Sequence, residues 1–393
     1  SIPMVMLLLV WSYIQRYFGW YPRAKKTQEY SKEGVPVPGT EHVTAEVVNG
    51  QDIVLSIDVD MQQRLEEALE VRVEEVQGSG GSAILMDSAT GEIYACSSSP
   101  TFDITDLSEI EEGATNLSGI SYAYEPGSVM KPATMLAALE EGVVTLDSKY
   151  WCPAALEVDE YTITDSHPRG DMEMDVSTII ADSSNVGVSL IARDLTFEKL
   201  YEYIQKYQLT ELTGVDYPGE AKGTISSRDT WAEVQGYNIS FGQGFTTTPT
   251  SNGSRFTRLL ANNGTATQPH FLLDVPTENE DRAYATSQLT DNQNAINDLE
   301  TMMQATVDRG TGTDAQMDGY RVVGKTGTAE IASETGGYKE SVYNLAFIGY
   351  LPDSSTNLVC FVGAYDVPGE RQTVQAFHDI MAFAIDRYNI TQN

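Results

Sequence analysis

The spacing of apolar residues in the first third of the chain predicts a strand, a helix and a hairpin. Residues 58–75 carry an apolar residue at every fourth position, which is typical of a helix with one buried face: Met61, Leu65, Leu69 and Val73. The apolar run Ile53–Ile57, just before this segment, predicts a short strand. Two further runs, Ala83–Met86 and Ile93–Ala95, flank a turn-forming Ser-Ala-Thr-Gly sequence and therefore predict a β-hairpin.

Strand-like patterns return near the other end of the chain. Three apolar runs predict strands there: Arg321–Val323, Leu345–Tyr350 and Leu358–Ala364. The last segment, Gln372–Tyr388, has a helical pattern, and so does most of the middle of the chain. Strands at both ends and helices between them predict an α+β domain whose sheet is assembled from both terminal regions.

The beginning of the chain has the pattern of a membrane anchor. The apolar run Ile2–Ile14 has 13 residues, whereas a membrane-spanning helix needs roughly 18 or more. Aromatic and then basic residues follow it, as at a membrane interface: Tyr17, Phe18, Trp20, Tyr21, Arg23, Lys25 and Lys26. We expect residues 1–21 to be a truncated anchor; the alternative is a buried or interfacial helix of a soluble protein. The polar residues 22–50 predict a linker.

Charge and composition exclude several classes of function. The 57 acidic and 24 basic residues give a net charge of −33, so the chain lacks the basic surface that nucleic-acid binding requires. Three separated cysteines are too few for a disulfide framework. The four histidines do not have metal-ligand spacing, and the sequence predicts neither a metal nor a cofactor: His42, His167, His270 and His378.

The sequence Glu-Pro-Gly-Ser-Val-Met-Lys-Pro at 125–132 contains the first candidates for chemistry. Pro-Gly predicts a turn, and the residues from Val129 to Glu141 predict a helix directly after it. Ser128 would then lie at the helix N-terminus, with Lys131 on the same face. This arrangement suits a serine nucleophile with a lysine base. The alternative is that Ser128 is a helix cap and Lys131 a surface residue.

Two further motifs lie downstream. Lys-Thr-Gly-Thr at 325–328 follows a predicted strand and offers a cation, two hydroxyls and a glycine that leaves room for a substrate along a strand edge. Ser-Ser-Asn at 183–185 lies in a helical context. Each motif also has a structural alternative. For Lys-Thr-Gly-Thr it is a loop that follows a strand, and for Ser-Ser-Asn it is a simple turn. Ser355–Asn357 has the same Ser-x-Asn pattern, and its neighbours predict only a turn between two strands.

The order of the three motifs is more specific than any one of them. Ser-x-x-Lys, Ser-x-Asn and Lys-Thr-Gly follow one another in penicillin-binding proteins and serine β-lactamases. The chain resembles the transpeptidase domain of class B penicillin-binding proteins, the bacterial cell-division and elongation type. The resemblance covers about residues 50–390 and rests on these stretches: Ile57–Asp58 with Gln62, Met86–Ile93, Tyr124–Pro132, Ser183–Gly187, Gly242–Gly244 and Gly324–Thr328. It implies an α+β fold with an antiparallel sheet flanked by helices and an all-helical subdomain.

The resemblance also implies a reaction and roles for the motif residues. Ser128 would attack the D-Ala-D-Ala bond of a peptidoglycan stem peptide and release the last D-Ala. An amine of a neighbouring strand would then resolve the acyl-enzyme into a crosslink, and β-lactams would acylate the same serine. Lys131 would be the general base, with a pKa depressed by a second cation nearby. Ser183 would relay the proton to the leaving amine, and Asn185 would orient Lys131 and the substrate amide.

The third motif would complete this site. Lys325 would set its electrostatics, and the backbone N–H groups of Ser128 and Thr328 would form the oxyanion hole. The substrate-binding residues would be Thr326, Gly327 and Thr328, with the two threonines at the terminal carboxylate. The glycines of Gly242–Gly244 would turn beneath the site, and Glu125 would be structural.

Class B proteins usually carry a large pedestal domain, for which residues 22–50 leave room only as a remnant. We expect residues 51–393 to form the transpeptidase domain, on the extracytoplasmic face of the bacterial cytoplasmic membrane with a single N-terminal anchor. A glycosyltransferase of the cell-wall machinery is the expected partner. The alternatives are a D,D-carboxypeptidase or β-lactamase, and a non-catalytic β-lactam-binding sensor or scaffold. A class A β-lactamase would also need a Glu-x-x-Leu-Asn loop, which is not found between Asn185 and Lys325.

Overall fold

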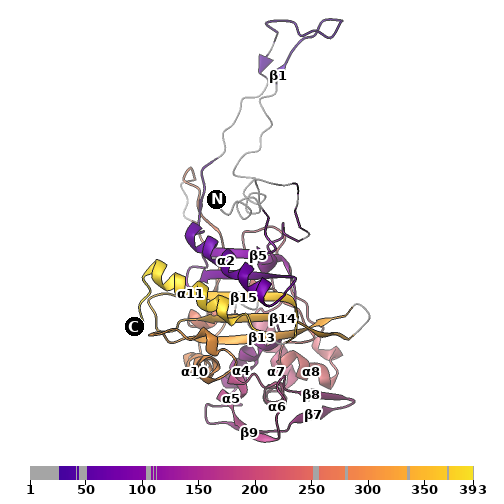
Figure 1. Cartoon of the computed structure of the whole chain (residues 1–393), viewed down its shortest axis with the longest axis vertical. Helices are drawn as coiled ribbons and strands as arrows, with labels where there is room; N and C mark the ends of the chain where they lie inside the picture. Colours follow the sequence, from indigo (N-terminus) through magenta and orange to yellow (C-terminus); the bar gives the residue numbers. More distant parts are fainter. Residues whose placement is uncertain are drawn as a thin grey trace.

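A computed structural model describes residues 26–40, 42–43, 51–102, 108, 110–111, 113–250, 256–278, 282–333, 337–369 and 371–392. Its centre is a five-stranded antiparallel sheet (Figure 1). In spatial order the strands are β13 (Val323–Ala332), β14 (Tyr338–Tyr350), β15 (Leu358–Pro368), β4 (Gly80–Asp87) and β5 (Ile93–Ser99). Strands from the two ends of the chain pair directly where β15 meets β4. The predicted sheet from both terminal regions is therefore confirmed.

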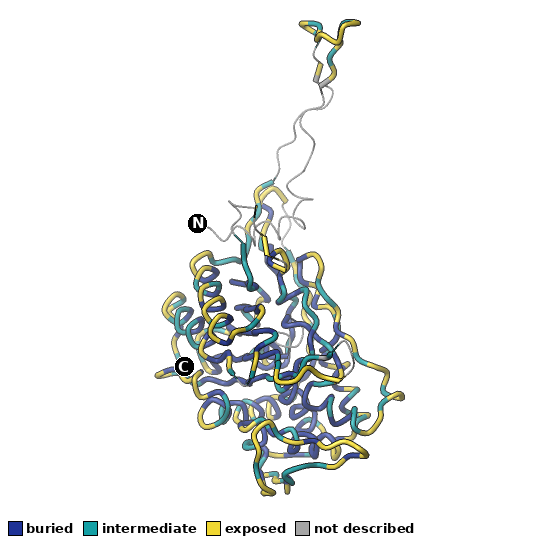
Figure 2. The backbone as a smooth tube through the Cα atoms, turned by 45° about the vertical axis from the view of Figure 1, so that its right-hand side comes forward, coloured by how far each residue is buried: buried dark blue, intermediate teal, exposed yellow. Residues whose placement is uncertain are grey.

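Both faces of this sheet are buried. On β14, Leu345 and Phe347 belong to one hydrophobic core, and Ala346 and Ile348 belong to another. Successive side chains of a strand point to opposite faces, so a strand that is apolar at every position must be covered on both sides. Helices α2 (Val59–Glu75) and α11 (Val374–Tyr388) cover the first face. The buried positions accordingly gather along the sheet and beneath it (Figure 2).

A mainly helical part covers the second face. Its helices are α4 (Lys131–Glu140), α5 (Val176–Ala181), α6 (Asn185–Leu195), α7 (Phe197–Lys206), α8 (Glu233–Ser240) and α10 (Gln293–Arg309). Helix α4 is buried at every position from Lys131 to Leu139, and a helix without a polar face must lie in the interior. The resemblance implied an all-helical subdomain, but this part also contains two small antiparallel sheets: β6 (Lys149–Cys152) with β9 (Met172–Asp175), and β7 (Ala155–Val158) with β8 (Tyr161–Thr164).

The remaining described elements are short. The helices are α3 (Ser118–Ser121), α9 (Thr257–Ala261), and the 3₁₀ turns η1 (Gly127–Met130), η2 (Arg228–Thr230) and η4 (Thr313–Ala315). The paired strands are β1 (Lys26–Thr27) with β2 (His42–Val43), β3 (Val54–Leu55) with β11 (Leu272–Asp274), and β10 (Thr265–Thr267) with β12 (Thr286–Gln288). The strand predicted at 53–57 is thus shorter than expected, whereas the predicted helix is confirmed: the Asp58 carboxylate caps α2 by accepting the Met61 N–H at 3.2 Å.

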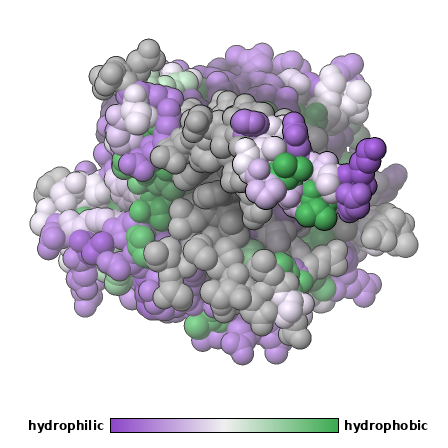
Figure 3. All heavy atoms as spheres, turned by 90° about the horizontal axis from the view of Figure 1, so that it is seen from above, coloured by the Kyte–Doolittle hydropathy of each residue, from purple (hydrophilic) through white to green (hydrophobic). Residues whose placement is uncertain are grey.

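The predicted anchor at residues 1–21 lies outside the described residues. Among the helices that the structure describes, none is both long and apolar enough to span a membrane. The division into anchor, linker and transpeptidase domain stays a prediction. Among the coloured residues of the face seen in Figure 3, most are hydrophilic.

Candidate active site

Ser128 lies on a tight turn that is pressed against the edge of the sheet. It belongs to the 3₁₀ turn η1, which leads directly into α4, so it precedes the helix and does not cap it. Gly127 has a φ of +56°, and a Cβ there would lie 2.6 Å from the carbonyl oxygen of Thr328 on β13. Only glycine tolerates both the backbone angle and this approach. The turn therefore brings the Ser128 backbone alongside Thr328.

The two lysines of the motifs meet at one hydroxyl. Lys131 is fully buried, and its Nζ donates to the carbonyl oxygen of Ser183 and to Ser183 Oγ, the latter at 3.0 Å. Lys325, also fully buried, donates to the same Oγ at 2.9 Å and to the carbonyl oxygen of Thr326 at 3.0 Å. Three motifs that are far apart in the sequence are therefore joined at Ser183.

Burial controls the protonation of both lysines. Burial lowers the pKa of Lys131 to about 7, and the Asp165 carboxylate opposes this shift. Burial, and next the charge of Lys131, hold the pKa of Lys325 well below its usual range. The expected fall in the Lys131 pKa is confirmed in direction, but desolvation and not repulsion between cations is its cause. Lys131 is thus suited to accept a proton near neutral pH.

The backbone of Ser183 is held in the left-handed region, with a φ of +58°. It closes α5, since the Ser183 N–H donates to Ile180 O at 3.2 Å and the next N–H, of Ser184, donates to Ile179 O at 2.9 Å. Glycine usually occupies this position at a helix end because it has no Cβ. A serine here carries a backbone cost that glycine does not, so neighbouring contacts must hold the turn in place.

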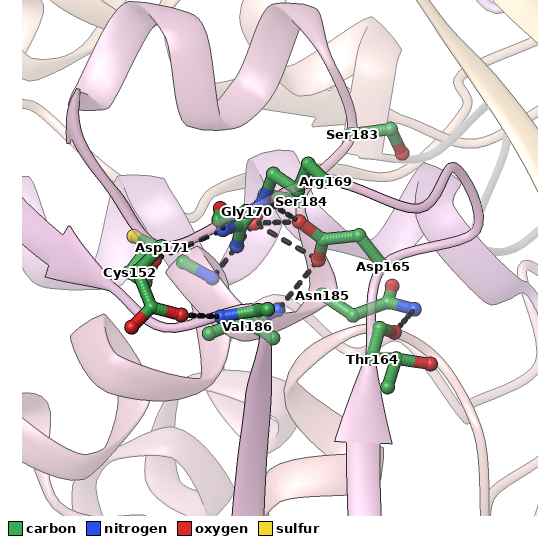
Figure 4. A network of polar contacts seen from close by, with 12 residues as sticks. Cys152, Thr164, Asp165, Arg169, Gly170, Asp171, Ser183, Ser184, Asn185 and Val186 are labelled. Carbon is green, nitrogen blue, oxygen red and sulfur yellow. Dashed lines mark hydrogen bonds and ion pairs between the residues drawn. The ribbon is translucent and has the colours of Figure 1, made fainter.

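Asn185 points to a different neighbour than expected. Its Nδ2 donates to the carbonyl oxygen of Thr164 at 2.9 Å (Figure 4). Within the described part of the chain, neither Asn185 nor Ser128 is hydrogen-bonded to Lys131, whose bonds go to Ser183. The expectation that Asn185 orients Lys131 is therefore corrected: Ser183 takes that place in this structure, and Asn185 fixes its own turn to the end of β8.

The Lys-Thr-Gly-Thr motif lies inside β13, the edge strand of the sheet, in agreement with its interpretation as a strand edge. The alternative, a loop after a strand, was wrong, and the strand predicted at 321–323 extends to Ala332. Pairing with β14 holds it extended, with Gly327 opposite Ala346. A Cβ at Gly327 would lie 2.9 Å from Val129 Cγ1, so this glycine makes room for η1 and not for a substrate. Thr326 is buried, and its hydroxyl is 2.6 Å from that of Thr311.

The motif residues that remain accessible line one cavity. Ser128, Asn185 and Thr328 border a cavity of about 390 Å³. The β7–β8 hairpin contributes to its wall through Tyr161 and the three residues after it. Lys131, Ser183 and Lys325 are not among the lining residues, so the shared hydroxyl and both amines lie behind the cavity surface.

The Gly-Gln-Gly sequence forms the support beneath η1, as predicted. The N–H of Gly127 donates to Gly242 O at 2.9 Å, and the Glu125 carboxylate accepts the N–H of Gly244 at 3.0 Å. Gln243 also lines the cavity and donates to Glu330 at 2.9 Å. Burial raises the pKa of Glu125, although the hydrogen bonds from Gly244 and Tyr338 oppose this shift.

Three polar residues next to the site escaped the sequence analysis: Thr311, Asp165 and Arg169. Thr311 is hydrogen-bonded to Thr326. Asp165 accepts the Ser184 hydroxyl of the Ser183 turn, and Arg169 donates to Asp165 (Figure 4). None of them belongs to a motif. The only available signal was the spacing of Asp165 and Arg169, four residues apart with opposite charge, which is common in any chain.

Residues 81–382 match the family model of the penicillin binding protein transpeptidase domain. The chain belongs to this family. PbpB of Mycolicibacterium smegmatis is 28% identical to this transpeptidase domain over 385 residues, which cover 93% of the chain and 59% of PbpB. The probable peptidoglycan D,D-transpeptidase PenA of Neisseria meningitidis is 27% identical over 317 residues, covering 80% of the chain and 52% of PenA. The chain therefore spans between about half and three fifths of these curated relatives.

The fold of this transpeptidase domain also agrees with a solved structure. Penicillin binding protein 3 from Mycobacterium tuberculosis, crystallised in complex with aztreonam, superposes with a TM-score of 0.79 at 25% identity. The superposition covers 92% of this chain and 87% of the other. The family implied by the order of the three motifs, and the α+β fold that comes with it, are thus confirmed.

Proposed function

We propose that the chain is a peptidoglycan D,D-transpeptidase that works through an acyl-enzyme on Ser128 and is acylated by β-lactams. The observation that carries the proposal is the position of Ser183 Oγ, 3.0 Å from Lys131 Nζ and 2.9 Å from Lys325 Nζ, behind a cavity lined by Ser128 and Thr328. This arrangement holds a proton acceptor and a relay next to a serine that substrate can reach. PenA carries the transpeptidase activity in its name, and penicillin binding protein 3 binds a β-lactam.

In the first half of the reaction, Ser128 Oγ bonds to the carbonyl carbon of the D-Ala-D-Ala peptide bond. Neutral Lys131 takes the hydroxyl proton, and the oxyanion is stabilised by the backbone N–H groups of Ser128 and Thr328. When the C–N bond breaks, the proton passes from Lys131 through the Ser183 hydroxyl to the departing amine. Free D-Ala leaves, and the donor peptide stays bound to Ser128 as an ester.

In the second half, the amine of an acceptor peptide attacks the ester carbonyl. The proton that the amine loses returns through Ser183 and Lys131 to Ser128 Oγ as the ester bond breaks. A new amide bond then joins the two strands. Of the two motif threonines, Thr328 lines the cavity and binds the substrate carboxylate. Thr326 is buried and is hydrogen-bonded to Thr311. Asn185, which lines the cavity, binds the substrate amide.

The setting of the reaction belongs to the same proposal. The substrate lies outside the cytoplasm, so the domain would act on the extracytoplasmic face, held by the N-terminal anchor predicted at residues 1–21. Growing glycan strands would come from a partner glycosyltransferase of the cell-wall machinery.

The test is the mass of the intact protein after incubation with a penicillin, for the wild type, Ser128→Ala and Ser166→Ala. Ser166 lines the same cavity and is the matched control. We expect a stable adduct of one penicillin on the wild type and on Ser166→Ala, and no adduct on Ser128→Ala.

The outcomes separate the alternatives. Rapid loss of the drug without an adduct would make the protein a β-lactamase. An adduct on Ser128→Ala would place the nucleophile elsewhere. Incubation of the wild type with a D-Ala-D-Ala peptide and an amine acceptor then distinguishes transfer from hydrolysis, because only a transpeptidase yields the amine-linked product. Adduct formation without turnover of the peptide would indicate a sensor.

A further inference from the structure

The turn that carries Ser183 is clamped by the loop that follows β8 (Figure 4). The Asp165 carboxylate accepts the Ser184 hydroxyl at 2.9 Å and the Val186 N–H at 3.0 Å. One residue earlier, the carbonyl oxygen of Thr164 accepts Asn185 Nδ2. The last residue of β8 and the first residue of the loop after it thus hold the three residues that follow Ser183.

This clamp matters because the conformation of Ser183 is strained. Its left-handed φ of +58° is maintained only where neighbouring contacts fix the backbone on both sides. Helix α5 fixes the preceding side, and the hydrogen bonds to Asp165 fix the following side. A turn released on that side would move Ser183 Oγ away from its two lysines.

Asp165 is itself held in place by Arg169. Arg169 Nε donates to Asp165 Oδ2 at 2.6 Å, and the side chains are only 9% exposed for Asp165 and 16% for Arg169. Arg169 Nη1 also donates to the carbonyl oxygens of Cys152, at the end of β6, and of Gly170. A carboxylate this deep needs such a partner, and the pair ties the clamp to the β6–β9 sheet.

Asp165 also acts on the lysine pair through its charge. Burial lowers the pKa of Lys131, and Asp165 raises it. The other charged or titratable groups around this cluster are Lys325 on β13, Arg169 in the same loop, Cys152 on β6 and His167 on the cavity wall. Asp165 thus opposes the excess of positive charge that the two lysines and Arg169 bring together.

We propose that Asp165 is a positioning residue for acylation, which clamps the Ser183 turn through Ser184 and Val186 and supplies the negative charge that faces Lys131. The proposal rests on the proposed function, because the step it supports is the acylation of Ser128. The clamp sets the acylation rate of the form in which Lys131 is neutral. The charge of Asp165 sets the pH range in which Lys131 becomes neutral.

The experiment measures the acylation rate with a fluorescent penicillin across the neutral range of pH. For Asp165→Asn we expect a maximal rate roughly tenfold lower, since a charge-assisted hydrogen bond to the turn is lost. The acid limb of the profile moves to lower pH, because Lys131 loses the charge that raised its pKa. Arg169→Gln should move the limb to higher pH, because the guanidinium no longer offsets Asp165.

Ser184→Ala separates the two roles. It removes the hydroxyl that joins Asp165 to the turn and leaves every charge in place, so the maximal rate should fall while the acid limb stays where it is. Asp165→Glu restores the charge and should return the limb to its wild-type position. Because Ser184 also caps α6 by accepting the Gly187 N–H at 2.9 Å, thermal unfolding of each variant shows whether it is folded.

Two control variants lie in the same loop. Asp171 accepts the N–H of Ala154 at 2.8 Å, so Asp171→Asn removes an equal charge without loosening the Ser183 turn and should keep the wild-type profile. Histidine changes charge near neutral pH, and His167→Gln should leave the acid limb unmoved if Lys131 is responsible for it.

The results can overturn the proposal in distinct ways. A wild-type rate and pH profile for Asp165→Asn would refute it entirely. A lower rate with an unmoved limb in both Asp165→Asn and Arg169→Gln would reduce Asp165 to a structural residue. If Asp165→Asn does not fold, the pH profile of Arg169→Gln is decisive. An acid limb that does not move to higher pH in that variant would refute the charge role of Asp165. Failure of the wild type itself to be labelled would instead reject the proposed function.

Discussion

Substitution of Gly242 by alanine should disturb the nucleophile without touching any reactive group. A Cβ at Gly242 would lie 2.0 Å from the carbonyl oxygen of Gly127, and the backbone of Gly242 has a φ of +93°. Real Cβ atoms do not approach an oxygen so closely, so the turn η1 must move. Because η1 carries Ser128 and packs against β13, movement of η1 separates the two halves of the expected oxyanion hole.

The magnitude follows from two costs. A left-handed backbone costs an L-residue roughly 1–2 kcal/mol, and forcing an extra methyl group into a packed site adds about 1–3 kcal/mol. Gly219 provides the matched control, because its φ is +83° and a Cβ there meets nothing within 4 Å. Gly219→Ala should therefore show only the first cost, whereas Gly242→Ala should lose about 2–5 kcal/mol of unfolding free energy.

Urea unfolding measures the stability of both variants, and labelling by a fluorescent penicillin measures the acylation rate. We expect Gly242→Ala to be the less stable of the two and to be acylated at least roughly tenfold more slowly than the wild type, while Gly219→Ala is labelled at the wild-type rate. Equal stability and equal labelling of the two variants would refute the argument that Gly242 supports Ser128 through close contact.

Four further predictions concern the buried groups of the site. Acylation of the wild type should increase as the pH rises through about 7, the pKa to which burial lowers that of Lys131, because only the neutral amine accepts a proton; a rate independent of pH would contradict this. Lys131→Met should reduce the labelling rate on the order of a thousandfold. Its urea midpoint at pH 6 should be unchanged or higher, because the substitution removes a buried charge. A clear loss of stability would contradict the argument that burial of this charge is unfavourable. In the wild type, the unfolding free energy should rise with pH above about 7, because the unfolded chain holds the Lys131 proton more tightly than the folded one, and this slope should be reduced in Lys131→Met. Thr311→Val removes the hydroxyl bonded to Thr326 and should cost about 1 kcal/mol in thermal unfolding; an unchanged melting temperature would mean that the bond contributes nothing.

The helices and strands that could be predicted from the sequence are those whose hydrophobic pattern lies within a few neighbouring residues. Helix α2 follows from the spacing of Met61, Leu65 and Leu69. The apolar runs of β14 and β15 were recognised because every position is buried on one face or the other. The order of the three motifs was sufficient for the family, because their combination is rare even though each is common.

Contacts between distant segments could not be predicted in this way. The strand β13 extends through Lys-Thr-Gly-Thr because β14 pairs with it, and neither glycine nor lysine indicates a strand by itself. Gly327 was taken as an opening for substrate, yet its neighbour is Val129, nearly 200 residues earlier in the sequence. The bonds from Asp165 to Ser184 and Val186 join a loop to a turn, and no periodicity describes either.

The pairing of β15 with β4 has a consequence for how the molecule forms. A ribosome delivers β15 long after β4 and β5, so the central sheet cannot close until the whole segment through β15 has been synthesised. Contacts of such long sequence separation form slowly, because the loop between them must be ordered first. The helices between Lys131 and Arg309 can pack on one another earlier, but Lys325 reaches Ser183 only with the last strands. The nascent chain should therefore remain inert toward penicillin until β15 has left the ribosome, and mutations at the β4–β15 seam should delay the appearance of labelling before they change its final rate.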